Sequence, residues 1–192
     1  AAGFSAASLR PVEDPCGAAH GELVGLWDEA TIAATRSGLL ATRVSFADDT
    51  WARVRPRLDA YAQGLVGMRV DACRAHEEGR SSMRLFDMRT ACLDQRHTSL
   101  AAFVAIVQRA DAEVVGNAAA AAANLPAIAG CGDTQALADA VPPPDDPASA
   151  ARVAELRGVL AEAEADELAG QFTRGLELVD GIQLGELSYP PL

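Results

Sequence analysis

Two cysteines and two histidines gather in the stretch VDACRAHEEGRSSMRLFDMRTACLDQRH, residues 70–97. They are Cys73, His76, Cys92 and His97. Two sulfur and two nitrogen donors match the ligand set of a tetrahedral zinc site. On a helix, however, the five-residue step from Cys92 to His97 turns the side chains about 140° apart. This geometry disfavours zinc, and we expect both histidines at helix ends or on solvated faces.

The same cysteines also fit a disulfide framework, because the chain has four cysteines, an even number. A turn near residues 77–82 would fold the chain between Cys73 and Cys92 into two antiparallel helices with both sulfurs at their seam. The remaining bond would then join Cys16 to Cys131. Four cysteines allow three connectivities, and sequence alone does not choose among them. The alternative is four reduced cysteines, buried as small apolar side chains in a cytoplasmic protein.

Motifs of familiar catalytic chemistry are absent from the sequence. It contains no GxGxxG or GxxxxGK[ST] phosphate loop, no GxSxG, no HExxH and no kinase HRD or DFG set. All 16 basic residues are arginine, which excludes Schiff-base chemistry on lysine. The carboxylates of Asp48 and Asp49, like those of Asp145 and Asp146, are adjacent and do not face each other on a helix. We therefore assign no catalytic, cofactor-binding or metal-binding residue and expect this chain not to be an enzyme.

The composition is typical of a folded protein, with 49% hydrophobic and 22% charged residues. A formal charge of −11 disfavours nucleic acid, which binds through clustered cations. The most apolar stretch, residues 114–130, is interrupted by Asn117, Asn124 and Pro126, so we expect no membrane-spanning segment. Abundant alanine and few aromatic residues favour helix throughout.

Apolar spacing predicts an all-α fold, with a bundle of about four long helices followed by a helical hairpin. Residues 1–15 are predicted to be a tether, and residues 16–141 the bundle. Its helices are expected at 16–41, 45–79, 83–107 and 111–124, with a short helical turn after residue 133. Gly21, Gly25 and Gly38 fall within the first of these helices, where they either allow close packing or are simply tolerated.

The segment VPPPDDP contains three consecutive prolines, which predict a stiff extended linker over residues 142–147. Residues 148–192 are then expected to form two helices joined by a turn at GQF. Small residues at Ala163 and Gly175, with Gly170 and Phe172 around the turn, resemble one tetratricopeptide repeat. One such repeat cannot bury both of its faces. The resemblance therefore implies that the hairpin starts a repeat array.

The blocks WDEA, RTACLDQR and AVPPP resemble the region after the kinase domain in myxobacterial-type serine/threonine protein kinases with tetratricopeptide repeats. The resemblance covers residues 14–192. In that family this region often follows a transmembrane helix, which implies an extracytoplasmic (periplasmic) location, where disulfides persist. The family pattern has cysteines at positions matching all four here. Together with the cysteine count and the hairpin turn, it favours a Cys73–Cys92 bond and leaves Cys16 to pair with Cys131.

The resemblance implies a non-catalytic sensor or protein-interaction module of a receptor-like serine/threonine protein kinase. Kinase domain and membrane helix would both lie outside this chain. The partner would be a protein, a peptide or a small ligand, whose binding changes how the kinases pair. One alternative is a cytoplasmic helical scaffold that joins the kinase to its repeats with reduced cysteines. Another is a metal-binding protein that uses Cys73, His76, Cys92 and His97.

Overall fold

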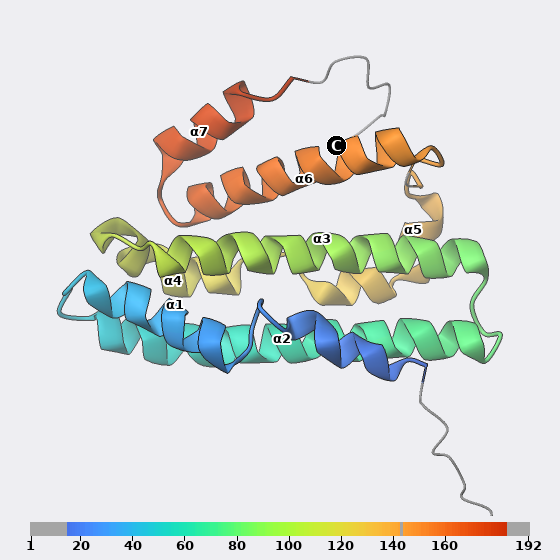
Figure 1. Cartoon of the computed structure of the whole chain (residues 1–192), viewed down its shortest axis with the longest axis horizontal. Coiled ribbons are helices and arrows are strands. Elements are labelled where there is room, and N and C mark those ends of the chain that lie inside the picture. The colour runs from blue at the N-terminus through green and yellow to red at the C-terminus, as the bar shows by residue number, and fades with distance from the viewer. Residues whose placement is uncertain (1–14, 143, 184–192) are drawn as a thin grey trace, which may run out of the picture.

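The computed structural model describes residues 15–142 and 144–183, and every regular element in these ranges is a helix (Figure 1). The predicted all-α class is therefore confirmed. The predicted tether lies outside the described residues except for Pro15, as does the end of the predicted hairpin from residue 184. In chain order the elements are η1 (Gly17–Leu23), α1 (Glu29–Ala41), α2 (Ala47–Glu77), α3 (Met83–Gln108), α4 (Ala112–Ala123), η2 (Ile128–Gly132), α5 (Thr134–Asp139), α6 (Pro147–Leu168) and α7 (Phe172–Asp180).

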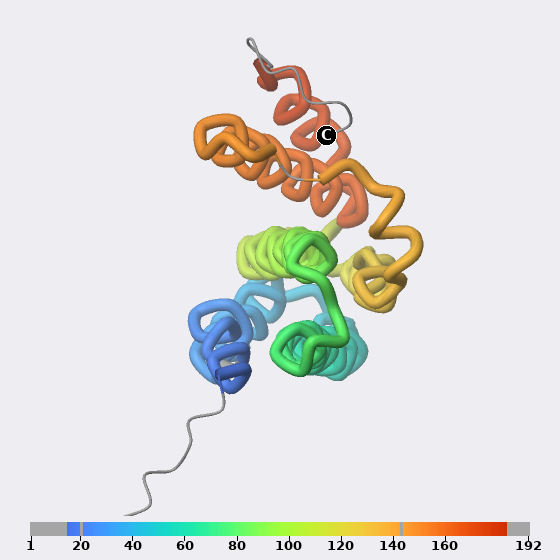
Figure 2. The backbone as a smooth tube through the Cα atoms, turned by 90° about the vertical axis from the view of Figure 1, so that its right-hand side faces the viewer, coloured from blue at the N-terminus to red at the C-terminus, as the bar shows by residue number. Residues whose placement is uncertain are grey.

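The two longest helices, α2 and α3, run antiparallel and side by side along the bundle (Figure 1). Figure 2 looks along their axes and shows η1 and α1 on one side of this pair, with α4 and η2 on the other. Helix α6 packs on α3 from the side away from α2, and α7 in turn packs on α6. The hairpin thus lies on the bundle as an outer layer.

Apolar side chains of the two central helices face the core. Leu58 and Leu65 of α2 and Leu100 and Phe103 of α3 are fully buried. The core also takes in the loop before α1, because Trp27 is only 6% exposed and its indole N–H donates to the Asp59 carboxylate at 2.8 Å. A buried indole N–H needs a hydrogen-bond partner, so this bond holds the loop before α1 against α2.

The single helix predicted over residues 16–41 is wrong, because the chain breaks between η1 and α1. Gly25 has φ +76°, in the left-handed region that favours glycine. The Asp28 carboxylate accepts the backbone N–H of Gly25 at 2.7 Å and that of Thr31 at 2.9 Å. One side chain therefore closes the turn and caps α1, and these bonds lower the pKa of Asp28.

Side-chain caps begin the later helices close to where the sequence predicted. Ser82 accepts the N–H of Leu85 at 3.2 Å at the start of α3. Asp133 caps the short helix α5, and Asp146 caps α6. Helix α6 starts at Pro147, where a missing backbone N–H costs nothing.

The segment Ala112–Gly132 has the length and mean hydropathy of a membrane-crossing helix. In the fold it is not one helix, because α4 ends at Ala123 and residues 124–127 are non-helical before η2 begins. A membrane span must satisfy its backbone groups within the helix, which this break prevents. Val115 and Ala118 are fully buried, so α4 belongs to the core of the bundle.

Gly38 is required where α1 crosses α3, since a Cβ atom there would stand 2.3 Å from the carbonyl oxygen of Gln108. We expect Gly38→Ala to lower the free energy of unfolding by about 1–3 kcal/mol through overpacking. Gly67 is the matched control, because it is exposed in the interior of α2 with nothing within 4 Å of an added Cβ. Gly67→Ala should raise the free energy of unfolding by about 0.5–1 kcal/mol. Urea denaturation tests both, and a stabilised Gly38→Ala would contradict the close crossing.

Candidate functional site

All four cysteines form disulfides, Cys16 with Cys73 and Cys92 with Cys131. The predicted pairing, Cys73 with Cys92 and Cys16 with Cys131, is therefore wrong. In the observed bonds the Cα atoms are 5.6 Å and 5.5 Å apart, inside the usual range for a disulfide.

The short elements η1 and η2 explain the observed pairing. Because the chain breaks at Gly25, η1 does not continue α1 but lies along α2, which brings Cys16 to Cys73. The η2 segment contacts both central helices and places the buried Cys131 against Cys92 of α3. Each bond therefore ties one short segment to one central helix, and neither bond joins α2 to α3 directly.

Arg89 of α3 holds η2 beside the second disulfide. This side chain is only 5% exposed, yet its guanidinium donates to the carbonyl oxygen of Cys131 at 3.3 Å and to the Asp71 carboxylate at 2.6 Å. The sulfur of Met68 lies 3.2 Å from the same group. A buried guanidinium is costly unless it is paired, so these partners make Arg89 a structural residue.

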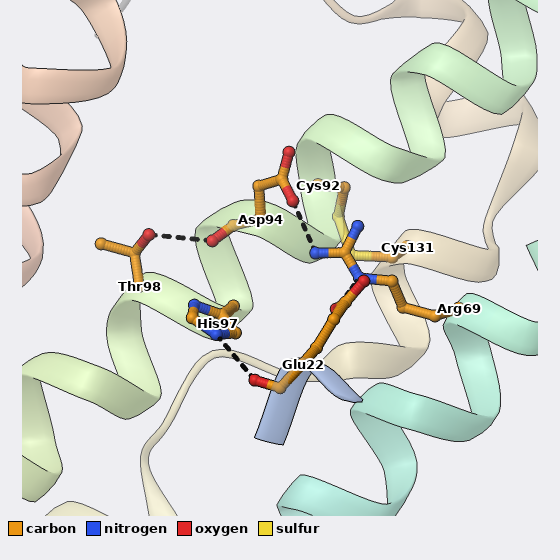
Figure 3. Close-up of polar contacts among 7 residues, drawn as sticks. All are labelled: Glu22, Arg69, Cys92, Asp94, His97, Thr98 and Cys131. Atoms are coloured by element: carbon orange, nitrogen blue, oxygen red, sulfur yellow. Dashed lines mark hydrogen bonds and ion pairs between the residues drawn. A yellow bond between two sulfur atoms is a disulfide. The ribbon is translucent and has the colours of Figure 1, made fainter. Parts of the chain in front are cut away.

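A second arginine links η1 to both central helices beside the Cys92–Cys131 bond (Figure 3). Arg69 of α2 pairs with Glu22 of η1 and with Asp94 of α3, each at 2.5 Å. The carbonyl oxygen of Glu22 also lies 3.4 Å from Nε2 of His97. His97 therefore contacts the backbone of η1, which the sequence did not predict.

The two histidines of the zinc alternative have separate surroundings. The ring of His76 stacks on Phe86 with centroids 4.8 Å apart, while His97 contacts η1. All four sulfur atoms are used in the two disulfides, which leaves no thiolate to bind a metal. Among the described residues, no three His, Cys, Asp or Glu side chains gather as a metal-binding group.

Helices α6 and α7 meet at the small residues that the sequence singled out. A Cβ atom on Gly175 would lie 3.1 Å from the carbonyl oxygen of Ala163, so the two backbones almost touch. In the turn between them Gly170 has φ +89°, a conformation that favours glycine. The Asn117 side chain of α4 donates to the carbonyl oxygen of Ala169 at 3.2 Å and so ties this turn to the bundle.

The hairpin leaves an open groove of about 520 Å³ between its two helices. Phe172, Leu176 and Val179 line it from α7, opposite Leu160 and Ala163 of α6. The three α7 side chains are 61%, 65% and 45% exposed. A cluster of large apolar side chains in contact with water is often a binding surface, which makes this groove a candidate site. The charged residues that line this groove are both glutamates of α6.

A second cleft of about 350 Å³ opens between α3 and α6. Phe86, Thr90 and Asp94 line it from α3, and Val153 and Arg157 from α6. None of the strongly exposed apolar side chains of the described residues lines this cleft. The α6–α7 groove is therefore the stronger candidate for a binding surface.

Asp166 of α6 lies where the hairpin meets the bundle, next to two arginines. Its carboxylate is fully buried and lies 3.7 Å from Arg109 at the end of α3 and 3.5 Å from Arg174 of α7. Burial raises the pKa of Asp166, and the two arginines oppose that rise. Burial likewise lowers the pKa of Arg109. The contact therefore joins three helices at a cost in desolvation.

The disulfide pairing can be read directly from a tryptic digest of the unreduced chain. Arginines separate all four cysteines in the sequence, so each cysteine falls in a different tryptic peptide. We expect mass spectrometry to find one linked pair with Cys16 and Cys73 and another with Cys92 and Cys131. A peptide pair that links Cys73 to Cys92 would restore the pairing predicted from sequence and refute the observed one.

Asp166 should make stability fall as pH rises. The pKa of Asp166 is higher in the folded chain than the ordinary 3.8. Above pH 3.8 the folded state therefore holds the proton more tightly than the unfolded state does. The amide that replaces this carboxyl group in Asp166→Asn cannot titrate. The free energy of unfolding of the variant, relative to the unchanged chain, should therefore rise as pH increases from about 4 to 7. Urea denaturation across this range tests the sign, and a relative stability that falls with pH would show that the arginines outweigh burial.

Comparison of the chain with protein-family models, curated proteins and solved structures returns no match. The function proposed for this chain therefore rests on its own residues and fold.

Proposed function

We propose that this chain is a non-catalytic helical module that binds a protein or peptide partner. The observation that carries the proposal is the α6–α7 groove, with Phe172, Leu176 and Val179 exposed along it. These residues follow each other at steps of four and three, so they form one apolar stripe on α7. A helix with a similar stripe could lie in the groove, a recognised mode of peptide binding.

The roles of the reactive and charged side chains support binding rather than catalysis. The cysteines are oxidised, Arg69 binds the carboxylate of Glu22 in η1, and Arg89 binds the carbonyl oxygen of Cys131 in η2. Asp166, a buried carboxylate with a raised pKa, faces two arginines between packed helices and not an open cavity. These groups lie inside the fold, whereas the groove is open to solvent and lined mainly by apolar side chains.

Two disulfides are more consistent with an extracytoplasmic location than with the reducing cytoplasm. They support our proposal that the chain is the periplasmic part of a membrane-anchored serine/threonine kinase, which the sequence resemblance also implies. Binding in the groove would then change the pairing or orientation of the kinase domains. The cytoplasmic scaffold with reduced cysteines has less support, because both bonds are formed.

The proposal that the hairpin begins a tetratricopeptide array draws on the same groove. The close crossing of Ala163 and Gly175 resembles the small-residue contact within such a repeat. In a solenoid each unit buries its apolar face against the next one. The exposed stripe on α7 supports this reading as well as the binding of a separate partner.

Binding can be tested with a fluorescent amphipathic peptide that has leucines at i, i+4 and i+7 and an uncharged polar face. We expect the chain to bind this probe by fluorescence anisotropy. Leu176→Asp should weaken binding at least about tenfold, because it places a charge in the centre of the apolar stripe.

Val24→Asp is the matched control, since Val24 is also a strongly exposed apolar residue (76%) but lies on a different part of the surface. This control should leave the affinity unchanged. Failure of the unchanged chain to bind, or equal loss of affinity in both variants, would refute the groove as the binding surface.

A further inference from the structure

We propose that the partner helix carries basic side chains along one edge of its apolar face, the edge that lies on α6. This inference rests on the proposed function, since it defines the chemistry of the partner for the same groove. It depends on where the charges of the hairpin lie.

The charged residues lining the groove are Glu164 and Glu167 of α6. They are three residues apart and so lie within one turn on the same side of that helix. Both are exposed. Within the described part of the chain, the carboxylates of the hairpin that form ion pairs are those of Glu155 and Asp166. The two groove glutamates therefore remain available to a cation from outside.

No arginine lines the groove among the described residues. Helices α6 and α7 together carry seven acidic residues against three arginines. Arg152 pairs with Glu155 and Arg174 pairs with Asp166, whereas Arg157 lines two clefts toward the bundle, one of which it shares with Glu164. The charged side chains that line the groove itself are thus both negative, which disfavours an acidic partner and favours a basic one.

The charge lies on one edge of the groove only. The α7 edge presents Leu176 and Val179, whereas the α6 edge presents Glu164 and Glu167 beside Leu160. A partner that matches both edges needs two cations about one helical turn apart on one side of its stripe. Arginine and lysine suit this place, because their aliphatic stems pack on apolar surface while the charged end reaches a carboxylate.

Three peptides that share one leucine stripe test the inference. One carries two arginines along one edge, one carries two glutamines there and one carries two glutamates. Each exposed ion pair contributes about 1 kcal/mol or less, and the arginine peptide can form two of them. We therefore expect it to bind about tenfold more tightly than the glutamine peptide at low salt. The glutamate peptide should bind least, and the differences should shrink as salt rises toward about 1 M.

The double variant Glu164→Arg/Glu167→Arg should reverse this order, so that the glutamate peptide binds best. The matched control is Glu29→Arg/Glu77→Arg, which changes the net charge equally at exposed positions on α1 and α2. The control should keep the original order. A reversal in both double variants would assign the preference to net charge and overturn the inference.

The outcomes separate the inference from the proposed function. Equal binding of the three peptides overturns the basic edge and leaves the groove as a binding surface. Absence of binding by all three refutes both. Binding that appears only after removal of residues 184–192 would assign the groove to that segment of the chain itself. Self-association that Leu176→Asp abolishes would assign it to a second copy. Either result would overturn the inference.

Discussion

Burial on several sides of α3 is the constraint on which the rest of the structure depends. Leu100, Phe103 and Val107 pack into the main core with α2 and α4, while Ala102 and Ile106 face α6. A helix that presents apolar side chains on two sides must be covered on both. The bundle alone leaves the second side of α3 open, so α6 has to dock there. The hairpin is therefore a required layer of this fold.

The bundle and the α6–α7 hairpin are held in place by different interactions. Both disulfides close loops within residues 16–131, and Arg69 and Arg89 pin the short segments η1 and η2 on the same framework. The hairpin lies beyond these loops, and its contact with α3 includes small side chains such as Ala161 and Ala165. Alanine buries little area, so each contact contributes less than a leucine would. We expect local opening to begin at the hairpin.

Much of the fold could be predicted from the sequence because helix periodicity is a local signal. The apolar spacing predicted helices over residues 45–79 and 83–107, close to the bounds of α2 and α3. The break at Gly25 was missed, since only the left-handed turn closed by Asp28 distinguishes it from a tolerated glycine. That one break turned η1 back along α2 and changed which cysteines could meet. The groove was also beyond sequence reasoning, although the spacing of Ala163 and Gly175 indicated the helix crossing beside it.

The order of the disulfides has a consequence for how the chain matures. Each bond joins cysteines that are consecutive in the sequence, Cys16 with Cys73 and then Cys92 with Cys131. In the pairing expected from sequence, the Cys16–Cys131 loop would have enclosed the Cys73–Cys92 loop. Cys16 could then have formed its bond only after the whole chain up to Cys131 was present. In the observed order, neither loop contains another cysteine, so each bond can form whether or not the other is present.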